Sequence, residues 1–110
     1  MLRLLALILS LVCLANAGKP PADRTALIAK LQRDLDKAMS RGTPTDKEIL
    51  ILKKSRQDLT SSKNDEVAAA IDNIDRVAHT QSFRSQDASD IRKDIGNIRG
   101  HKSFLFLRLP

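Results

Sequence analysis

The chain has 110 residues, a formal net charge of +6 and a single cysteine. This length is enough for one domain and no more. With no Trp, no Tyr and three Phe, the chain has no aromatic platform on which bases of single-stranded nucleic acid could stack. We therefore expect no nucleic-acid partner, although the positive charge favours contact with anionic surfaces.

The first 17 residues have the pattern of a secretory signal peptide. Arg3 precedes an apolar run from Leu4 to Leu14 that is interrupted only by Ser10, and Ala15-Asn16-Ala17 supplies small residues at the positions a signal peptidase requires. The run is well short of the ~20 residues that span a bilayer as a helix. The sequence therefore predicts cleavage after Ala17 and a secreted or periplasmic protein that lacks cysteine.

Apolar residues at helical spacing predict four helices in the remainder, over residues 22–40, 46–61, 65–79 and 86–99. No segment shows the alternation typical of a strand. Because the connections are short, consecutive helices are expected to lie antiparallel. The predicted fold class is all-α, a small antiparallel bundle of about four helices after a cleaved signal peptide, with a bundle domain at 18–103 and an apolar tail at 104–110.

Local signals refine these helices. Thr45 and Glu48 form the pattern of a capping box at the start of the second helix, and Ser85 is a candidate cap for the fourth. The run Ile49–Leu52 is apolar on every side of its helix, so we expect that helix to be covered on several sides. Asp72 and Arg76 stand four residues apart, the spacing of a surface ion pair.

A short phrase recurs in the first and fourth helices. Leu31-Gln32-Arg33-Asp34-Leu35 resembles Ile91-Arg92-Lys93-Asp94-Ile95 in its order of apolar, polar and acidic residues. The repeat could record duplication of a helical hairpin, but the better explanation is one amphipathic period that occurs twice in a limited set of residue types.

The C-terminal tail, which includes Phe104 and Phe106, is strongly apolar and follows a basic stretch at 99–102. One interpretation is that it folds back and fills a groove in the bundle. A second is that it inserts into an anionic membrane surface, and a third is that it docks on a partner. It is too short to span a bilayer.

A basic stripe runs along the first helix. Lys30, Arg33, Lys37 and Arg41 recur three or four residues apart, so they share one side of the helix. Such a stripe is commonly a solvated face, but it is also suited to lipid phosphate or an acidic partner. Together with Phe104 and Phe106, these four residues are the candidate surface-binding set.

Catalytic, cofactor and metal chemistry are not predicted. His79 and His101 lie in unrelated contexts, and a metal site requires three or four supported ligands. His79 is better explained as a residue favoured at a helix C-terminus. Asp90 and Asp94 share a helix face, but hard cations generally require more oxygens and a turn that gathers them. The sequence thus predicts a protein that is not an enzyme.

The apolar stripes of four short helices offer a small core, so self-association or a partner that covers apolar surface is expected. The predicted function is that of an exported non-enzymatic helical protein acting by protein–protein contact or self-association. The alternative is an envelope or membrane-surface protein that binds anionic lipid through the basic stripe and the apolar tail.

Overall fold

The computed structural model describes residues 22–108, which confirm the all-α prediction. They form α2 (Ala22–Arg41), α3 (Asp46–Asp58), α4 (Asn64–Ala78), α5 (Ser85–Gly100) and a terminal 3-10 helix, η1 (Lys102–Arg108), with no strand among them. The predicted signal peptide and its cleavage site lie outside the described residues. None of the helices described is both long enough and apolar enough to cross a membrane.

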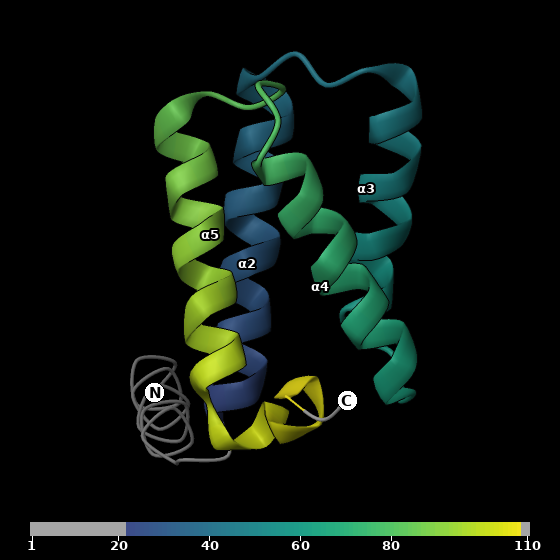
Figure 1. Cartoon of the computed structure of the whole chain (residues 1–110), viewed down its shortest axis with the longest axis vertical. Coiled ribbons are helices and arrows are strands. Elements are labelled where there is room, and N and C mark those ends of the chain that lie inside the picture. The colour runs from purple at the N-terminus through teal and green to yellow at the C-terminus, as the bar shows by residue number, and fades with distance from the viewer. Residues whose placement is uncertain (1–21, 109–110) are drawn as a thin grey trace, which may run out of the picture.

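The four α-helices form a small bundle in which the first and last helices are close neighbours (Figure 1). α2 packs along α5, α3 packs along α4, and α4 joins the two pairs through its contact with α5, whereas α2 and α3 touch least. The pair α2–α5 is antiparallel, since Arg24 near the start of α2 contacts Ser103 beyond the end of α5, and Arg41 at the end of α2 contacts Asp87 at the start of α5.

α2 ends where the chain must pass close to another loop. The Gly42 amide donates to the Ala38 carbonyl, and the Thr43 amide donates to the Ser82 carbonyl at 2.8 Å. A Cβ atom on Gly42 would lie 2.5 Å from the Ser82 oxygen, which is closer than real Cβ contacts. Glycine is therefore required here by the close approach of the α2–α3 and α4–α5 loops.

The capping box at the start of α3 is present as predicted. The Glu48 amide donates to Thr45 Oγ1 at 3.1 Å, and the Thr45 amide donates to Glu48 Oε1 at 2.9 Å. Glu48 Oε1 also accepts from Ser82 Oγ at 2.7 Å. These hydrogen bonds lower the pKa of Glu48, the bond from the Thr45 backbone most of all. One local signal thus also anchors α3 to the α4–α5 loop.

Two expectations for α3 are wrong. The helix ends at Asp58 and not at residue 61, because the amides of Thr60 and Ser61 donate to carbonyls three residues back and no longer four. The helix is also not covered on several sides: Leu52 is buried, but Leu50 is 71% exposed. The reason is that α3 packs mainly on α4, so an all-round apolar helix leaves one side uncovered.

α4 and α5 begin and end within one residue of the predicted positions. His79 caps the C-terminus of α4, as expected. Ser85 does not cap α5: it is already the first residue of the helix, and Arg84 is the N-cap, without a side-chain hydrogen bond. Asp72 does not pair with Arg76 but reaches across to Arg99 on α5 at 2.9 Å.

The core lies between the α2–α5 and α3–α4 pairs and takes residues from all five helical elements and from two loops. Its buried apolar members are Ile28, Leu31, Leu35, Ala38, Leu52, Leu59, Val67, Ala70, Ile71, Ile74, Val77, Ala78, Phe83, Ala88, Ile91, Ile95, Ile98 and Phe104. Phe83 comes from the α4–α5 loop and Phe104 from η1. The C-terminal segment thus contributes a large side chain that the helices alone do not supply.

Candidate functional site

The basic stripe on α2 is divided by its contacts with α5. Lys30 Nζ lies 3.0 Å from Asp34 Oδ2 and 3.4 Å from Asp94 Oδ1, and Arg41 Nε lies 3.6 Å from Asp87 Oδ2. The hydrogen bond to Asp34 is the main cause that raises the pKa of Lys30. Two of the four predicted binding residues are therefore engaged in ion pairs within the bundle.

The other two cations of the stripe, Arg33 and Lys37, are exposed. Neither makes an ion pair with another described residue. The structure therefore does not bring the four basic residues together as one uninterrupted surface.

The α2–α5 seam, defined here as Lys30, Asp34 and Arg41 of α2 with Asp87 and Asp94 of α5, contains buried carboxylates. Asp94 is only 3% exposed and Asp87 only 2%. The side chain of Asp94 lies against both Lys30 and Asp34, which come from the opposite helix. The two copies of the recurring phrase therefore pack against each other, with their aspartates meeting.

Burial is the main cause that raises the pKa of Asp94 to about 7, and the hydrogen bond and negative charge of Asp34 add to it. The pKa of Asp34 is lowered, chiefly by its hydrogen bond with Asp94. Asp94 Oδ2 is buried and has no hydrogen-bond partner in the part of the chain described. Protonation of Asp94 relieves the burial of its negative charge beside the carboxylate of Asp34, so below neutral pH the two carboxyl groups hold one proton between them.

Asp87 is the second buried carboxylate of the seam. Neither of its oxygens has a hydrogen-bond partner within residues 22–108, and its nearest opposite charge is that of Arg41. It stands in the first turn of α5, where a negative charge is favoured by the helix dipole.

The C-terminal segment folds back on the bundle, as one of the sequence interpretations expects. Phe104 is fully buried, and Phe106 and Leu107 pack against the core as partly buried side chains. Arg24 lies over both rings, 4.8 Å from the centre of Phe104 and 5.7 Å from that of Phe106. Phe104 is thus not at the surface, contrary to its place in the predicted surface-binding set, because it completes the core between α2 and α5.

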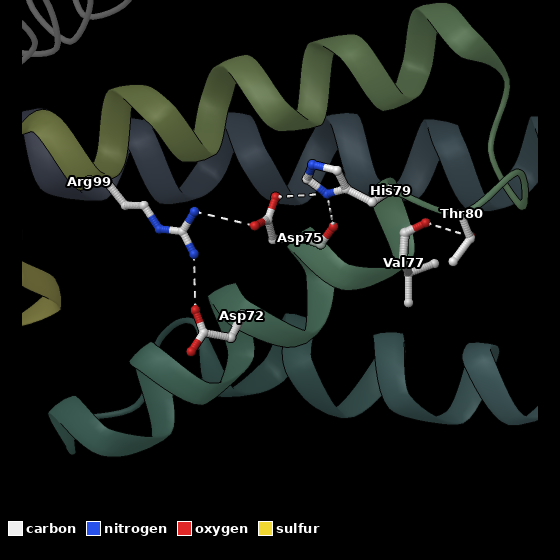
Figure 2. A network of polar contacts seen from close by, with 6 residues as sticks. All are labelled: Asp72, Asp75, Val77, His79, Thr80 and Arg99. Carbon is white, nitrogen blue, oxygen red and sulfur yellow. Dashed lines mark hydrogen bonds and ion pairs between the residues drawn. The ribbon is translucent and has the colours of Figure 1, made fainter.

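A network of charged side chains connects α4 and α5. Figure 2 shows Arg99 of α5 reaching Asp72 at 2.9 Å and Asp75 at 3.3 Å, with the ring of His79 on the other side of Asp75. The His79 Nδ1 atom is 2.8 Å from the Asp75 carbonyl oxygen and 3.5 Å from its carboxylate. His79 therefore interacts with the C-terminal turn of its own helix, as predicted for this position.

The outer face of α3, defined here as Lys47, Leu50, Lys53 and Lys54, is a surface that the sequence did not single out. All four residues are exposed, and Lys54 pairs with Asp58 on its own helix at 2.7 Å. α3 is tied to α2 by Arg56, whose guanidinium contacts both carboxylate oxygens of Asp36 at 2.8 and 2.9 Å. These contacts leave the outer face uncovered by the other described helices.

Two of the hollows on the surface of residues 22–108 lie beside the helix pairs. One, of about 250 Å³, lies between the first half of α2 and the end of α3 and is lined by Ile28, Ala29 and Leu59 among others. The second, of about 520 Å³, lies at the α4–α5 loop and is lined by His79, Arg84 and Arg92 among others. Within residues 22–108, no three His, Cys, Asp or Glu side chains are grouped to hold a metal ion.

Sequence reasoning had a signal for the buried aspartates that it did not use. Asp87, Ile91, Asp94 and Ile98 are spaced by four, three and four residues, so the two aspartates lie on the apolar stripe of α5. In contrast, the grouping of Arg84 and Arg92 with His79 depends on the path of the α4–α5 loop, which leaves no spacing pattern in the sequence. Comparison of this chain with protein-family models, with curated proteins and with solved structures finds no match.

Proposed function

We propose that this protein is exported, is not an enzyme, and acts by binding another protein through the outer face of α3. The observation that carries the proposal is the 71% exposure of Leu50 in the middle of a helix. Single exposed leucines are ordinary in soluble proteins. Leu50 differs because Ile49 and Ile51, its neighbours on the two sides of the helix, are themselves only partly buried, so the apolar surface continues around it.

The charges around Leu50 indicate the kind of partner. Lys47 and Lys53 lie one turn before and after it, are exposed, and make no ion pair with any residue from 22 to 108. A second copy of the chain docking through the same face would place lysines against lysines, which opposes association. A partner surface with an apolar pocket bordered by carboxylates complements this face, because the pocket receives Leu50 and the carboxylates pair with the lysines.

The alternative function, binding of anionic lipid through the basic stripe and the tail, has less support. It draws on Lys30 and Arg41, which are paired with aspartates of the bundle, and on Phe104, which is fully buried. Arg33 and Lys37 remain available to it, as does the partly exposed side of Phe106.

Cross-linking and capture from the native envelope or medium tests the proposal. The exported protein should capture an acidic partner that the Leu50→Ser variant captures roughly ten- to a hundredfold less well, because burial of a leucine is worth about 1.5–3 kcal/mol. Leu105→Ser is the matched control, since Leu105 is an equally large apolar residue, 53% exposed, on η1.

Three results would contradict the proposal. The first is capture that Leu50→Ser and Leu105→Ser affect equally. The second is a dimer in light scattering that Leu50→Ser dissociates, which would make a second copy the occupant of this face. The third, against export, is a mass spectrum of the native protein that begins at Met1 and not after Ala17.

A further inference from the structure

The charged residues that border the cavity at the α4–α5 loop are two arginines. Its volume is about 520 Å³, within the range of small-molecule sites. Arg84, Arg92 and His79 line it, and no Asp or Glu does so. Arg84 and Arg92 are exposed and form no ion pair inside the described part of the chain.

The arginine further along α5 is neutralised by carboxylates of the protein. Two turns of α5 beyond Arg92, Arg99 contacts the carboxylates of Asp72 and Asp75 on α4 (Figure 2). At the cavity, the end of α4 offers His79 in place of a carboxylate, and the carboxylate beside that histidine, Asp75, is already engaged by Arg99 and His79. Arg99 is thus paired with carboxylates of the protein, whereas Arg84 and Arg92 are not paired with any described residue.

The rest of the lining defines what kind of anion fits. Phe83, Ala78 and Ala88 give the cavity an apolar wall, while Ser85 and Thr80 bring hydroxyl groups to its edge. Two guanidinium groups match the tetrahedral oxygens of phosphate, which accept paired hydrogen bonds from such groups. The apolar wall and the volume leave room for an organic group attached to the phosphate.

We propose that this cavity binds the phosphate group of an organic phosphate monoester or diester, held by Arg84 and Arg92. The chemistry is the same whether the phosphate belongs to a free small molecule or to a lipid headgroup. The site is distinct from the basic stripe of α2 and from the outer face of α3, and it does not depend on the function proposed above.

Titration of the exported protein, followed by backbone amide chemical shifts, tests the site. The probes are inorganic phosphate, glycerol 3-phosphate, and vesicles of phosphatidylglycerol in phosphatidylcholine, the last by flotation. We expect saturable shifts at residues 79–92. Arg84→Gln and Arg92→Gln should each weaken binding about tenfold or more, the usual loss when a charge-assisted hydrogen bond is removed.

Arg76→Gln is the matched control, since Arg76 is an exposed arginine of α4 outside the cavity. It removes the same charge and should change binding less than twofold. If a soluble phosphate binds and the Arg84 and Arg92 variants lose that binding, the ligand is a free phosphate compound. If only the vesicles bind, with the same loss in these variants, the ligand is a lipid headgroup. Absence of saturable binding with all three probes, or an equal loss in Arg76→Gln, would overturn the proposal.

Discussion

The α3–α4 hairpin and the α2–α5 seam are built on different physical principles. The hairpin joins helices that are consecutive in the chain, begins with a capping box, and its only buried polar side chain is that of Ser55. The seam joins the first and last α-helices described and buries two carboxylates, Asp87 and Asp94, against Lys30 and Arg41.

The difference shows where this fold is sensitive to its surroundings. Apolar contacts such as those of the hairpin are little affected by pH, whereas a buried carboxylate changes its contribution with protonation. The seam also joins the two described α-helices that are farthest apart in the chain. Next to it, the C-terminal segment packs on the bundle, with Phe104 beneath Arg24. Perturbations of the seam and of the hairpin should therefore differ in size and in pH dependence.

The largest expected effect comes from removing the buried aromatic side chain of η1. Phe104→Ala should lower the free energy of unfolding by about 3–5 kcal/mol, because it empties a fully buried aromatic site and removes the contact with Arg24. Urea denaturation measures the loss. Hydrogen exchange in the same variant should lose protection in α2 and α5 before α3 and α4.

Leu105→Ala is the control for this comparison. Leu105 is the neighbour of Phe104 but is 53% exposed, so its truncation should cost no more than about 0.5–1 kcal/mol. Equal losses in the two variants would mean that η1 does not complete the core.

The second effect concerns pH. The pKa of Asp94 is raised to about 7 in the fold from an ordinary 3.8, so the folded protein holds a proton that the unfolded chain releases between these values. This stabilisation is complete below pH 4 and is lost as pH rises through about 7, a change on the order of 2–4 kcal/mol. The lowered pKa of Asp34 acts in the opposite sense, and its contribution is lost only on stronger acidification.

Thermal or urea denaturation between pH 4 and 9 checks this expectation. Asp94→Asn should flatten the profile above pH 5, because asparagine does not titrate. Glu48 of the hairpin provides the contrast: its pKa is lowered, so its stabilisation is lost as pH falls below the ordinary value of about 4.5. A wild-type protein that becomes more stable from pH 5 to 8 would contradict the assignment to Asp94.

The smallest expected changes in the free energy of unfolding come from substitutions of two glycines, one where the loops of the two regions meet and one inside α5. Gly42→Ala should destabilise by roughly 1–3 kcal/mol, because its Cβ would meet the Ser82 oxygen where the loops cross. Gly96→Ala, in α5, has no atom within 4 Å of the added Cβ and should stabilise by up to about 1 kcal/mol. Denaturation midpoints of both variants decide the matter, and a stabilising Gly42→Ala would show that the loops can separate without cost.

Local interactions explain why much of the fold could be predicted. Three of these interactions act within a few residues of the chain. They are the Thr45–Glu48 capping box, the end of the first helix at Gly42 and Pro44, and the helical spacing of Val67, Ile71 and Ile74. Such signals depend on backbone hydrogen bonds and on the helical period, both of which are visible in sequence. The helix bounds in the structure accordingly differ from those predicted by at most three residues.

The candidate sites could be predicted only in part. Lys30 and Arg41 were recognised as part of a basic stripe, but their partners Asp94 and Asp87 come from a helix distant in the chain. Ser85 was expected to cap α5, yet Arg84 holds that place without a side-chain hydrogen bond. The exposure of Leu50 followed from which helix covers α3, and an apolar run carries no information about which of its sides a neighbour will cover.

The sequence by itself determined that this chain forms amphipathic helices with short connections, since helix formation and capping are local. Tertiary structure alone decided that the first and last helices pair, that two aspartates are buried between them, and that Phe104 completes the core. The physical reason is that burial depends on which surfaces meet. Two helices with equally apolar stripes can each pack on the same neighbour. Which of them does so depends on side-chain packing and charge pairs between residues far apart in the chain, and a local sequence pattern contains no information about these contacts.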